Sequence, residues 1–312
     1  MHNWCVIFTI YHSDKVFLGT ERTLAEFEIN GKQKKFVGGR TLPYIEDIET
    51  SEEELHSCHV TTVHIQSEQA VEAIQKPIGS YITIETGKPL SKHDHLMNVG
   101  ECLAEVLDRV LRPYYHGKLC VCGIGNRDLP ADALGPEVTR NLPLKVLSAC
   151  GLEGNFREVV SLEPGTVGTN NINTEVLVGG VTKAVGVDCL LLVDSLTAKE
   201  PARMFQTIQL STNGGLSPHL TGRKADWSAL GMPVISLGVP MAVPASVLLP
   251  DQDLDSTLFT STEVQSEIAT AGRMIAYSIL RVCFPSYSTA ECFIWSGLNN
   301  DPVLFDLDAW NA

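Results

Sequence analysis

Gly123-Ile124-Gly125-Asn126-Arg127-Asp128-Leu129-Pro130-Ala131-Asp132-Ala133-Leu134-Gly135-Pro136 joins a short apolar run to a segment with helical character. The apolar run, Leu119-Cys120-Val121-Cys122, predicts a buried strand, and the two glycines after it allow the backbone to turn sharply because they carry no Cβ. The segment 133–142 predicts a helix, which places Asp132 near its N-terminal cap, where backbone N–H groups and the helix dipole favour an anion. A strand, a glycine-rich turn and a helix together form the edge on which α/β proteins build binding sites.

This turn has two simpler interpretations. Gly123 and Gly125 have the initial spacing of a dinucleotide-binding fingerprint, but Asp128 occupies the position of the third glycine, where its carboxylate would repel a pyrophosphate. In the other interpretation, Asp132 only caps the helix that follows. The sequence argues against the first interpretation and leaves the second open.

A second acid closes another apolar run, Leu190-Leu191-Leu192-Val193-Asp194. The run predicts a central strand covered on both faces, with Asp194 at its carboxyl end. Ligands in open α/β sheets bind beyond the carboxyl ends of strands, so we expect Asp132 and Asp194 to converge. Two carboxylates that share a site cannot ionise independently; one keeps its proton while the other polarises a water, as amide hydrolysis requires. The alternative for Asp194 alone is a strand-end acid that hydrogen-bonds a loop.

Several ordered motifs resemble the spore germination protease family, whose members are endopeptidases that degrade small acid-soluble spore proteins. The segment around Asp132 is similar to the family pattern Gly-Leu-Gly-Asn, five variable residues, then Asp-Ala-Leu-Gly-Pro. Further similarity follows in the same order in Glu163-Pro164-Gly165-Thr166-Val167-Gly168, in Val193-Asp194-Ser195-Leu196-Thr197-Ala198, and in segments 207–211 and 231–240, with a weaker match at 79–86. The resemblance covers roughly residues 55–250.

This resemblance implies an endopeptidase of the aspartic type, because Asp132 and Asp194 fall on the two family aspartates regarded as catalytic. It implies an α/β fold, a three-layer αβα sandwich with a mainly parallel or mixed central sheet, related to the hydrogenase-maturation peptidases. The family enzyme is a homotetramer made as an inactive precursor in the developing spore. The expected partners are therefore small acid-soluble spore proteins as substrate and further copies of this chain, and the expected location is the cytoplasm of the spore core.

Six polar or charged residues are expected to bind the substrate. Three lie in the turn before Asp132, one follows the second acid, and two belong to the polar segment 217–224. They are Asn126, Arg127, Asp128, Lys199, His219 and Arg223. Arg223 is suited to steering an acidic peptide or stabilising an oxyanion, although an exposed linker with solvated cations explains it equally well.

The chain departs from the family pattern at several positions. Ile172-Asn173-Thr174-Glu175-Val176 stands where the family has Ile-Glu-Thr-Ser-Asp, the family's loop histidine is displaced to His219, and Lys199 replaces an arginine. Arginine and lysine are not interchangeable at a bidentate site. Two alternatives therefore stay open: a metal-dependent peptidase related to the hydrogenase-maturation proteases, with Asp132, Asp194 and His219 as ligands, and a catalytically silent homologue that binds spore proteins.

Composition argues against several classes of protein. The 312 residues carry a net charge of −14, which disfavours a nucleic-acid partner because a phosphate backbone would be repelled. No stretch approaches the ~20 apolar residues that span a bilayer, and no signal-peptide pattern opens the chain. The nine scattered cysteines indicate a reduced compartment, and no His-Glu-x-x-His pattern is present. We therefore expect a cytoplasmic globular protein without a membrane partner, metal or cofactor.

The chain is predicted to contain three regions. Residues 1–54 form a β-rich extension with a hairpin at Asn30-Gly31 and any pro-segment at its start, residues 55–284 form the α/β domain, and residues 285–312 form an aromatic tail that docks on the body or a neighbouring subunit. The acidic run from Glu46 to Glu54 predicts a solvated loop or helix edge. Apolar periodicity predicts helices at 94–111, 171–185 and 262–282.

Overall fold

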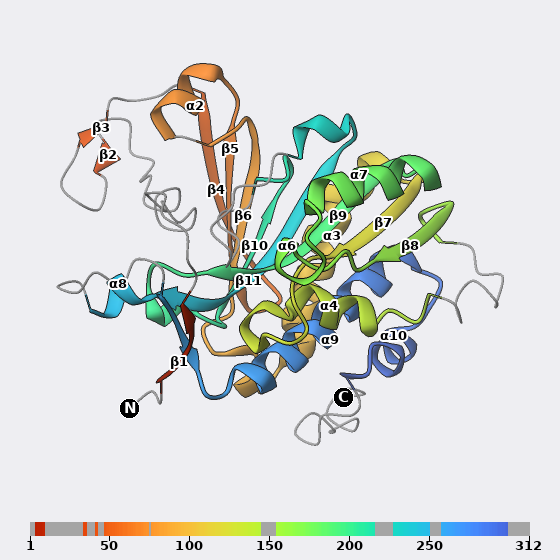
Figure 1. The fold of residues 1–312 in the computed structure, drawn as a ribbon. Helices are drawn as coiled ribbons and strands as arrows, with labels where there is room; N and C mark the ends of the chain where they lie inside the picture. Colours follow the sequence, from red (N-terminus) through yellow and green to blue (C-terminus); the bar gives the residue numbers. More distant parts are fainter. Residues whose placement is uncertain are drawn as a thin grey trace.

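The centre of the fold is a ten-stranded mixed sheet (Figure 1). The structure, a computed structural model, describes residues 4–9, 34–35, 41–42, 47–74, 76–144, 154–215, 227–249 and 257–298. Eight strands cross the sheet in the order β4 (Ile48–Leu55), β5 (Cys58–Ile65), β6 (Gly79–Glu85), β10 (Thr207–Ser211), β11 (Val234–Pro244), β9 (Cys189–Thr197), β7 (Lys118–Gly123) and β8 (Glu158–Leu162). The sheet is extended from β11 by β12 (Thr257–Ser261) and then β1 (Trp4–Thr9).

The sheet divides into a parallel part and an antiparallel part. Strands β11, β9, β7 and β8 run parallel to one another. Strands β4, β5, β6 and β10 are joined to each other and to β11 in antiparallel fashion. The carboxyl ends of the four parallel strands therefore face the same edge of the sheet.

Helices cover both faces of the sheet. The long helices are α3 (Leu96–Leu111), α7 (Thr174–Val185) and α9 (Val264–Cys283); the shorter ones are α2 (Glu68–Ile74), α4 (Leu134–Arg140), α6 (Val167–Asn170), α8 (Ala245–Leu248) and α10 (Thr289–Trp295). Single turns of 3-10 helix are η1 (Leu90–Lys92), η2 (Arg112–Tyr114), η3 (Pro130–Asp132), η4 (Pro201–Arg203) and η5 (Ser228–Leu230).

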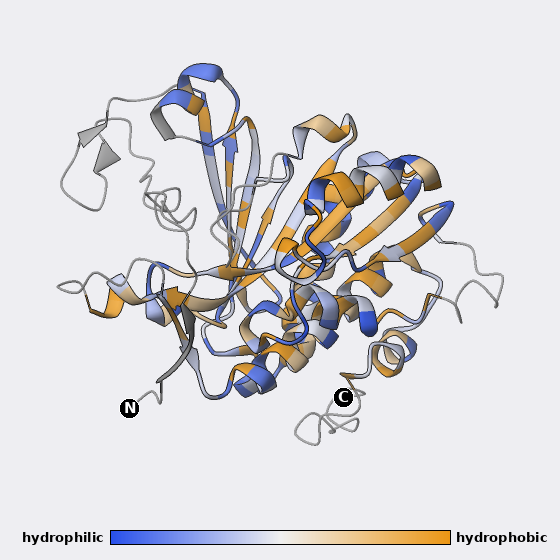
Figure 2. Cartoon of the chain, in the orientation of Figure 1, coloured by the Kyte–Doolittle hydropathy of each residue, from blue (hydrophilic) through white to orange (hydrophobic). Residues whose placement is uncertain are grey.

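Strand β9 shows why the sheet lies between two helical layers. Leu191 and Val193 belong to the large apolar cluster that contains side chains of α3, α4 and α9. Leu190 and Leu192 point to the opposite face, where they cluster with Val178 of α7. Because successive side chains of a strand point to opposite faces, a strand that is apolar throughout must be covered twice. The predicted α/β fold with a mixed central sheet is confirmed, and the apolar colour of β7 and β9 is visible in Figure 2.

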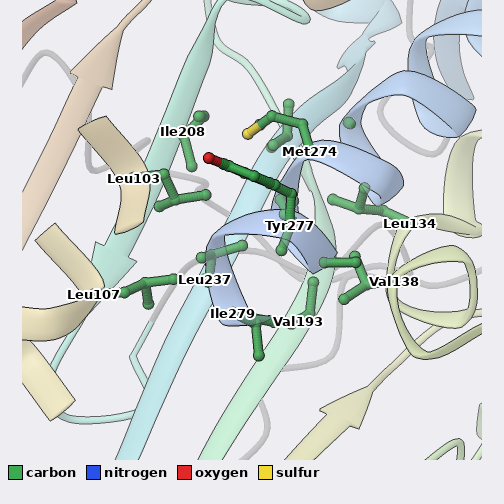
Figure 3. Close-up of a cluster of buried hydrophobic side chains, with 14 of the residues drawn as sticks. Leu103, Leu107, Leu134, Val138, Val193, Ile208, Leu237, Met274, Tyr277 and Ile279 are labelled. Carbon is green, nitrogen blue, oxygen red and sulfur yellow. The ribbon is translucent and has the colours of Figure 1, made fainter. Parts of the chain in front are cut away.

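The larger cluster is centred on Tyr277 of α9 (Figure 3). Around this ring lie Leu103 and Leu107 of α3, Leu134 and Val138 of α4, Met274 and Ile279 of α9, and Val193, Ile208 and Leu237 of the sheet. The Tyr277 hydroxyl donates a hydrogen bond to Glu101, so this buried ring also satisfies its polar atom. The cluster ties three helices to the strands that carry the candidate site.

The acidic run predicted as a loop or helix edge is largely an edge strand, so that prediction is wrong. β4 pairs with β5 along its whole length, from Ile48 opposite Ile65 to Leu55 opposite Cys58. Charged side chains on an edge strand hinder pairing with a second chain, and their exposure accounts for the polar composition. β4 also crosses the predicted boundary at residue 54.

Little of the predicted N-terminal extension is described. Its first strand is β1, which pairs with β12. The hairpin turn at Asn30-Gly31 and the start of any pro-segment lie outside the described residues. Nearby, β2 (Lys34–Lys35) and β3 (Thr41–Leu42) pair with each other.

The first part of the aromatic tail packs against the domain. Phe293 of α10 is buried in the large cluster, and the rings of Tyr287 and Trp295 lie 4.6 Å apart. Residues beyond 298 are outside the described part. Among the helices that are described, none is long and apolar enough to cross a membrane.

Candidate functional site

The turn after β7 folds back on itself. Gly125 has a φ of +139°, and a Cβ at this position would lie 1.9 Å from the carbonyl oxygen of Asp132. Only glycine allows this approach. As a result, the backbone N–H of Asn126 donates to both the carbonyl oxygen and Oδ2 of Asp132, each at 3.0 Å.

Asp132 is the last residue of η3 and is only 4% exposed. The N-cap of the following helix, α4, is Ala133, whose methyl group cannot accept a hydrogen bond. The interpretation of Asp132 as a simple cap of this helix is therefore wrong. Its carboxylate is instead held from the upstream side by the Asn126 N–H.

Asp194 is buried inside β9 and does not end it. The predicted strand end is wrong because β9 continues to Thr197, where it still pairs with Ala242 of β11. Pairing with β7, however, stops where Gly123 lies opposite Val193. Asp194 is 6% exposed, and its Oδ1 accepts a hydrogen bond from the N–H of Ser195 at 2.7 Å.

The two acids occur in segments that meet at the carboxyl edge of the parallel strands. The N–H of Ile124 donates to the carbonyl of Val193 at 2.8 Å. Beyond Asp132, the N–H of Leu134 donates to Ser195 Oγ at 3.4 Å. Cα atoms of η3 also lie within 8 Å of Cα atoms in β9. The turn that carries Asp132 is thus fastened to β9 on either side of Asp194.

Cys122 is the thiol nearest to this edge on the α7 face. Burial first, and then the nearby charges of Cys120 and Asp194, raise the pKa of Cys122 well above its ordinary value. The neutral thiol is a poor nucleophile and a poor metal ligand. This agrees with the burial of the side chain in the apolar cluster against α7.

The three turn residues expected to bind substrate lie beside Asp132, but with different surroundings. Asn126 Oδ1 accepts the N–H of Asp128 at 3.0 Å, which shapes the turn, while Asp128 itself is exposed. Arg127 forms a two-pronged ion pair with Glu163, the first residue after β8. This partner raises the pKa of Arg127 further.

Of the other three expected substrate residues, the structure describes Lys199. Lys199 follows β9 by two residues and is half-buried. His219 and Arg223 lie outside the described residues. Within the part that is described, no group of three or more His, Cys, Asp or Glu side chains could hold a metal ion.

Sequence reasoning missed a polar row across the sheet beside Asp194. Asp194 lies opposite Gly238 of β11, Gly238 opposite Gln209 of β10, and Gln209 opposite Thr83 of β6. Directly paired residues share one face, so Gln209 and Asp194 flank a position without a side chain. Gln209 is buried, at 2% exposed, although burying an amide is costly unless it is hydrogen-bonded. Strand order was needed to find this row.

Comparison with known proteins gives matches to the germination protease family. The family model described as Germination protease matches residues 26–260. The Germination protease of Caldanaerobacter subterraneus subsp. tengcongensis is 32% identical over 221 residues, covering 68% of this chain and 67% of that protein. The corresponding protein of Clostridium perfringens strain 13 is 30% identical over 201 residues, covering 62% of each chain, and that of Priestia megaterium is 29% identical over 221 residues, covering 66% of this chain and 59% of the relative.

The match spans about two thirds of the length of these relatives. Among the solved structures that match is a [NiFe] hydrogenase maturation protease HycI from Thermococcus kodakarensis KOD1. It has a TM-score of 0.36 and 18% identity, covering 56% of this chain and 98% of that one.

Proposed function

Since this chain belongs to the germination protease family, we propose that it is an endopeptidase whose catalytic groups are Asp132 and Asp194. The observation that supports the proposal is that the turn carrying the buried Asp132 is hydrogen-bonded to β9 on either side of the buried Asp194. Each carboxylate accepts a backbone N–H, from Asn126 and from Ser195. Such bonds hold a carboxylate in one orientation, as acid and base catalysis requires.

In the proposed reaction, one carboxylate takes a proton from a water as its oxygen attacks the carbonyl carbon of the scissile peptide. The other carboxyl group, acting as the general acid, protonates the departing amine. The C–N bond then breaks, leaving a new carboxylate and a new amine. No cofactor takes part in these steps.

The proposed substrates are small acid-soluble spore proteins, and the proposed setting is the cytoplasm of a spore core. The proposal includes the remaining family features: synthesis as an inactive precursor and assembly as a homo-oligomer, a tetramer in the family. Arg127, Lys199, His219 and Arg223 are cations or potential cations that suit an acidic peptide. Of these, Arg127 has its charge already matched by Glu163.

The test is cleavage of a purified small acid-soluble spore protein by the chain after any precursor has been processed to its active form, with and without a chelator. Asp132→Asn and Asp194→Asn should each lower the rate by at least about 10³-fold, because each removes a proton-transfer group. The exposed acid Asp94, which pairs with Lys88, supplies the matched control Asp94→Asn, and this variant should keep full activity.

The outcomes separate the three candidate functions. Cleavage that resists the chelator and needs both acids supports the proposal, and full activity in either acid variant overturns it. Cleavage abolished by the chelator identifies the metal-dependent alternative with Asp132, Asp194 and His219. Tight binding of the spore protein without cleavage identifies a silent homologue.

A further inference from the structure

The loop that carries Asn126 and ends at Asp132 is tied to the neighbouring strand by one ion pair. Arg127 Nε and Nη2 donate to the two carboxylate oxygens of Glu163. Arg127 follows the end of β7 and Glu163 follows the end of β8, so the pair links two adjacent loops at the carboxyl edge. A two-pronged arginine–carboxylate contact restrains both distance and orientation, unlike a single contact.

A short chain of contacts connects this ion pair to Asp132. Asn126, the residue before Arg127, donates its backbone N–H to Asp132 Oδ2 at 3.0 Å. The loop between them is closed by hydrogen bonds from the N–H of Leu129 to the Asn126 carbonyl, 3.1 Å, and from the N–H of Asp132 to the Leu129 carbonyl, 2.8 Å. Movement of Arg127 therefore moves the donor that faces the carboxylate.

We propose that Arg127 and Glu163 are a positioning pair, which holds the loop against the end of β8 so that the Asn126 N–H stays directed at the Asp132 carboxylate. This inference rests on the proposed function of Asp132. It assigns to Arg127 a role different from substrate binding: a guanidinium that already donates to Glu163 through Nε and Nη2 has its charge compensated before any substrate arrives. The role of Glu163 is to hold Arg127, and through Arg127 the loop.

The physical consequence concerns the ionised form of Asp132. An N–H that donates to a carboxylate favours the charged state, so a loop that moves away removes this stabilisation. The contribution of the ion pair to holding the loop is limited by solvent screening. Of the Arg127 side chain 49% is exposed, and of the Glu163 side chain 29%. Exposed pairs contribute up to about 1 kcal/mol, which corresponds to a factor of about five.

The experiment compares Arg127→Leu, Glu163→Leu and the charge-reversed double variant Arg127→Glu/Glu163→Arg in the full chain. The control is Arg157→Leu, because Arg157 forms a surface ion pair with Asp188, at 3.2 Å, at the opposite end of β8. Two quantities are measured: backbone hydrogen exchange of segment 124–132, which needs no activity, and the dependence of kcat and KM on pH. The other ionisable groups of this edge, including Asp128, Asp194 and Cys122, are unchanged in every variant.

Both single variants should exchange the 124–132 amides about fivefold faster and lower kcat about fivefold, with KM changed less than about twofold. The acidic limb of the kcat/KM profile should move to higher pH, and the reversed pair should restore each quantity at least in part. Arg157→Leu should change none of them.

Unchanged exchange in Arg127→Leu overturns the inference, as does a rise in KM with constant kcat, which would identify Arg127 as a substrate-binding residue. If the wild-type chain cleaves no spore protein, the proposed function fails on that result. The exchange measurement alone then decides whether the ion pair holds the loop.

Discussion

At the scale of single residues, backbone donors hold both acids of the candidate site. Asp132 is held by the Asn126 N–H and Asp194 by the Ser195 N–H. Main-chain donors are rigid because the strand or turn that carries them is rigid. The local sequence therefore matters where it permits a particular backbone path, and Gly125 is such a position.

Gly125→Ala tests this dependence. The added methyl would meet the Asp132 carbonyl oxygen at 1.9 Å in a backbone conformation that L-residues rarely adopt, so the turn must open. We expect a loss of about 3 kcal/mol in the free energy of unfolding, measured by urea denaturation, and a fall in kcat of at least about 10²-fold.

Gly87→Ala is the control, because it tests the cost of a positive φ at a position where an added Cβ is not crowded. Gly87 also has a positive φ, +72°, but a Cβ there meets no atom within 4 Å. This variant should lose only about 1 kcal/mol and keep its kcat. Equal effects of the two substitutions would show that closeness to Asp132 is unimportant.

At the scale of elements, a buried acid joins α9 to η1. Glu267 of α9 is 1% exposed and accepts hydrogen bonds from the N–H and Oγ of Ser91 in η1. Burial raises the pKa of Glu267 above its ordinary value of 4.5, and the hydrogen bonds from Ser91 oppose this shift in part. The contact between α9 and η1 should therefore respond to pH.

The sign of this response follows from proton linkage. A carboxyl group with a higher pKa in the folded state binds its proton more tightly when folded, so stability is greatest below the unfolded pKa and falls as pH rises towards the folded pKa. Glu267→Gln cannot ionise and should lack this fall. The free energy of unfolding of the variant minus that of the wild type should therefore be more positive at about pH 7 than at about pH 4.5. Urea denaturation at both pH values measures this difference.

Glu263→Gln is the matched control, at the N-cap of α9 and four residues before Glu267. Glu263 is exposed and pairs with Lys92 at 2.6 Å, so its replacement should leave the pH dependence from Glu267 in place. An identical pH dependence in wild type and Glu267→Gln would contradict the linkage argument.

At the scale of the whole molecule, one apolar cluster joins the sheet to α3, α4 and α9. Tyr277 lies at its centre and is fully buried, and its hydroxyl reaches Glu101, which also accepts from Arg281 Nε at 3.0 Å. A core of this kind favours cooperative unfolding of the sheet and its helices. The site is therefore coupled to the stability of the domain.

Tyr277→Ala should cost about 3–5 kcal/mol, because it leaves a cavity in a close-packed cluster. Tyr277→Phe should cost only about 1 kcal/mol, since the ring remains and Glu101 keeps its bond to Arg281. Both values come from urea unfolding followed by circular dichroism. Similar losses in the two variants would mean that the hydroxyl, and not the packing of the ring, dominates.

The sequence by itself predicted the elements with strong local signals. The helices found at α3 and α9 and the strands found at β7 and β9 follow from apolar periodicity and from unbroken apolar runs, which are properties of neighbouring residues. The acids after β7 and in β9 stand out for the same reason. The acidic run in β4 was misread because an exposed edge strand has the composition of a loop, and only its pairing with β5 distinguishes the two.

Which side chains from distant parts of the chain lie next to one another depends on the tertiary structure. Pairing of β9 with both β7 and β11 places Asp194 within a strand, next to Gly238 and, beyond it, Gln209. The same strand order brings Glu163 to Arg127, although 36 positions separate them in the chain. The spacing of apolar residues in the sequence indicates which side chains of one segment are buried. Strand order, and with it the meeting of distant side chains, depends on the packing of the whole sheet against both helical layers.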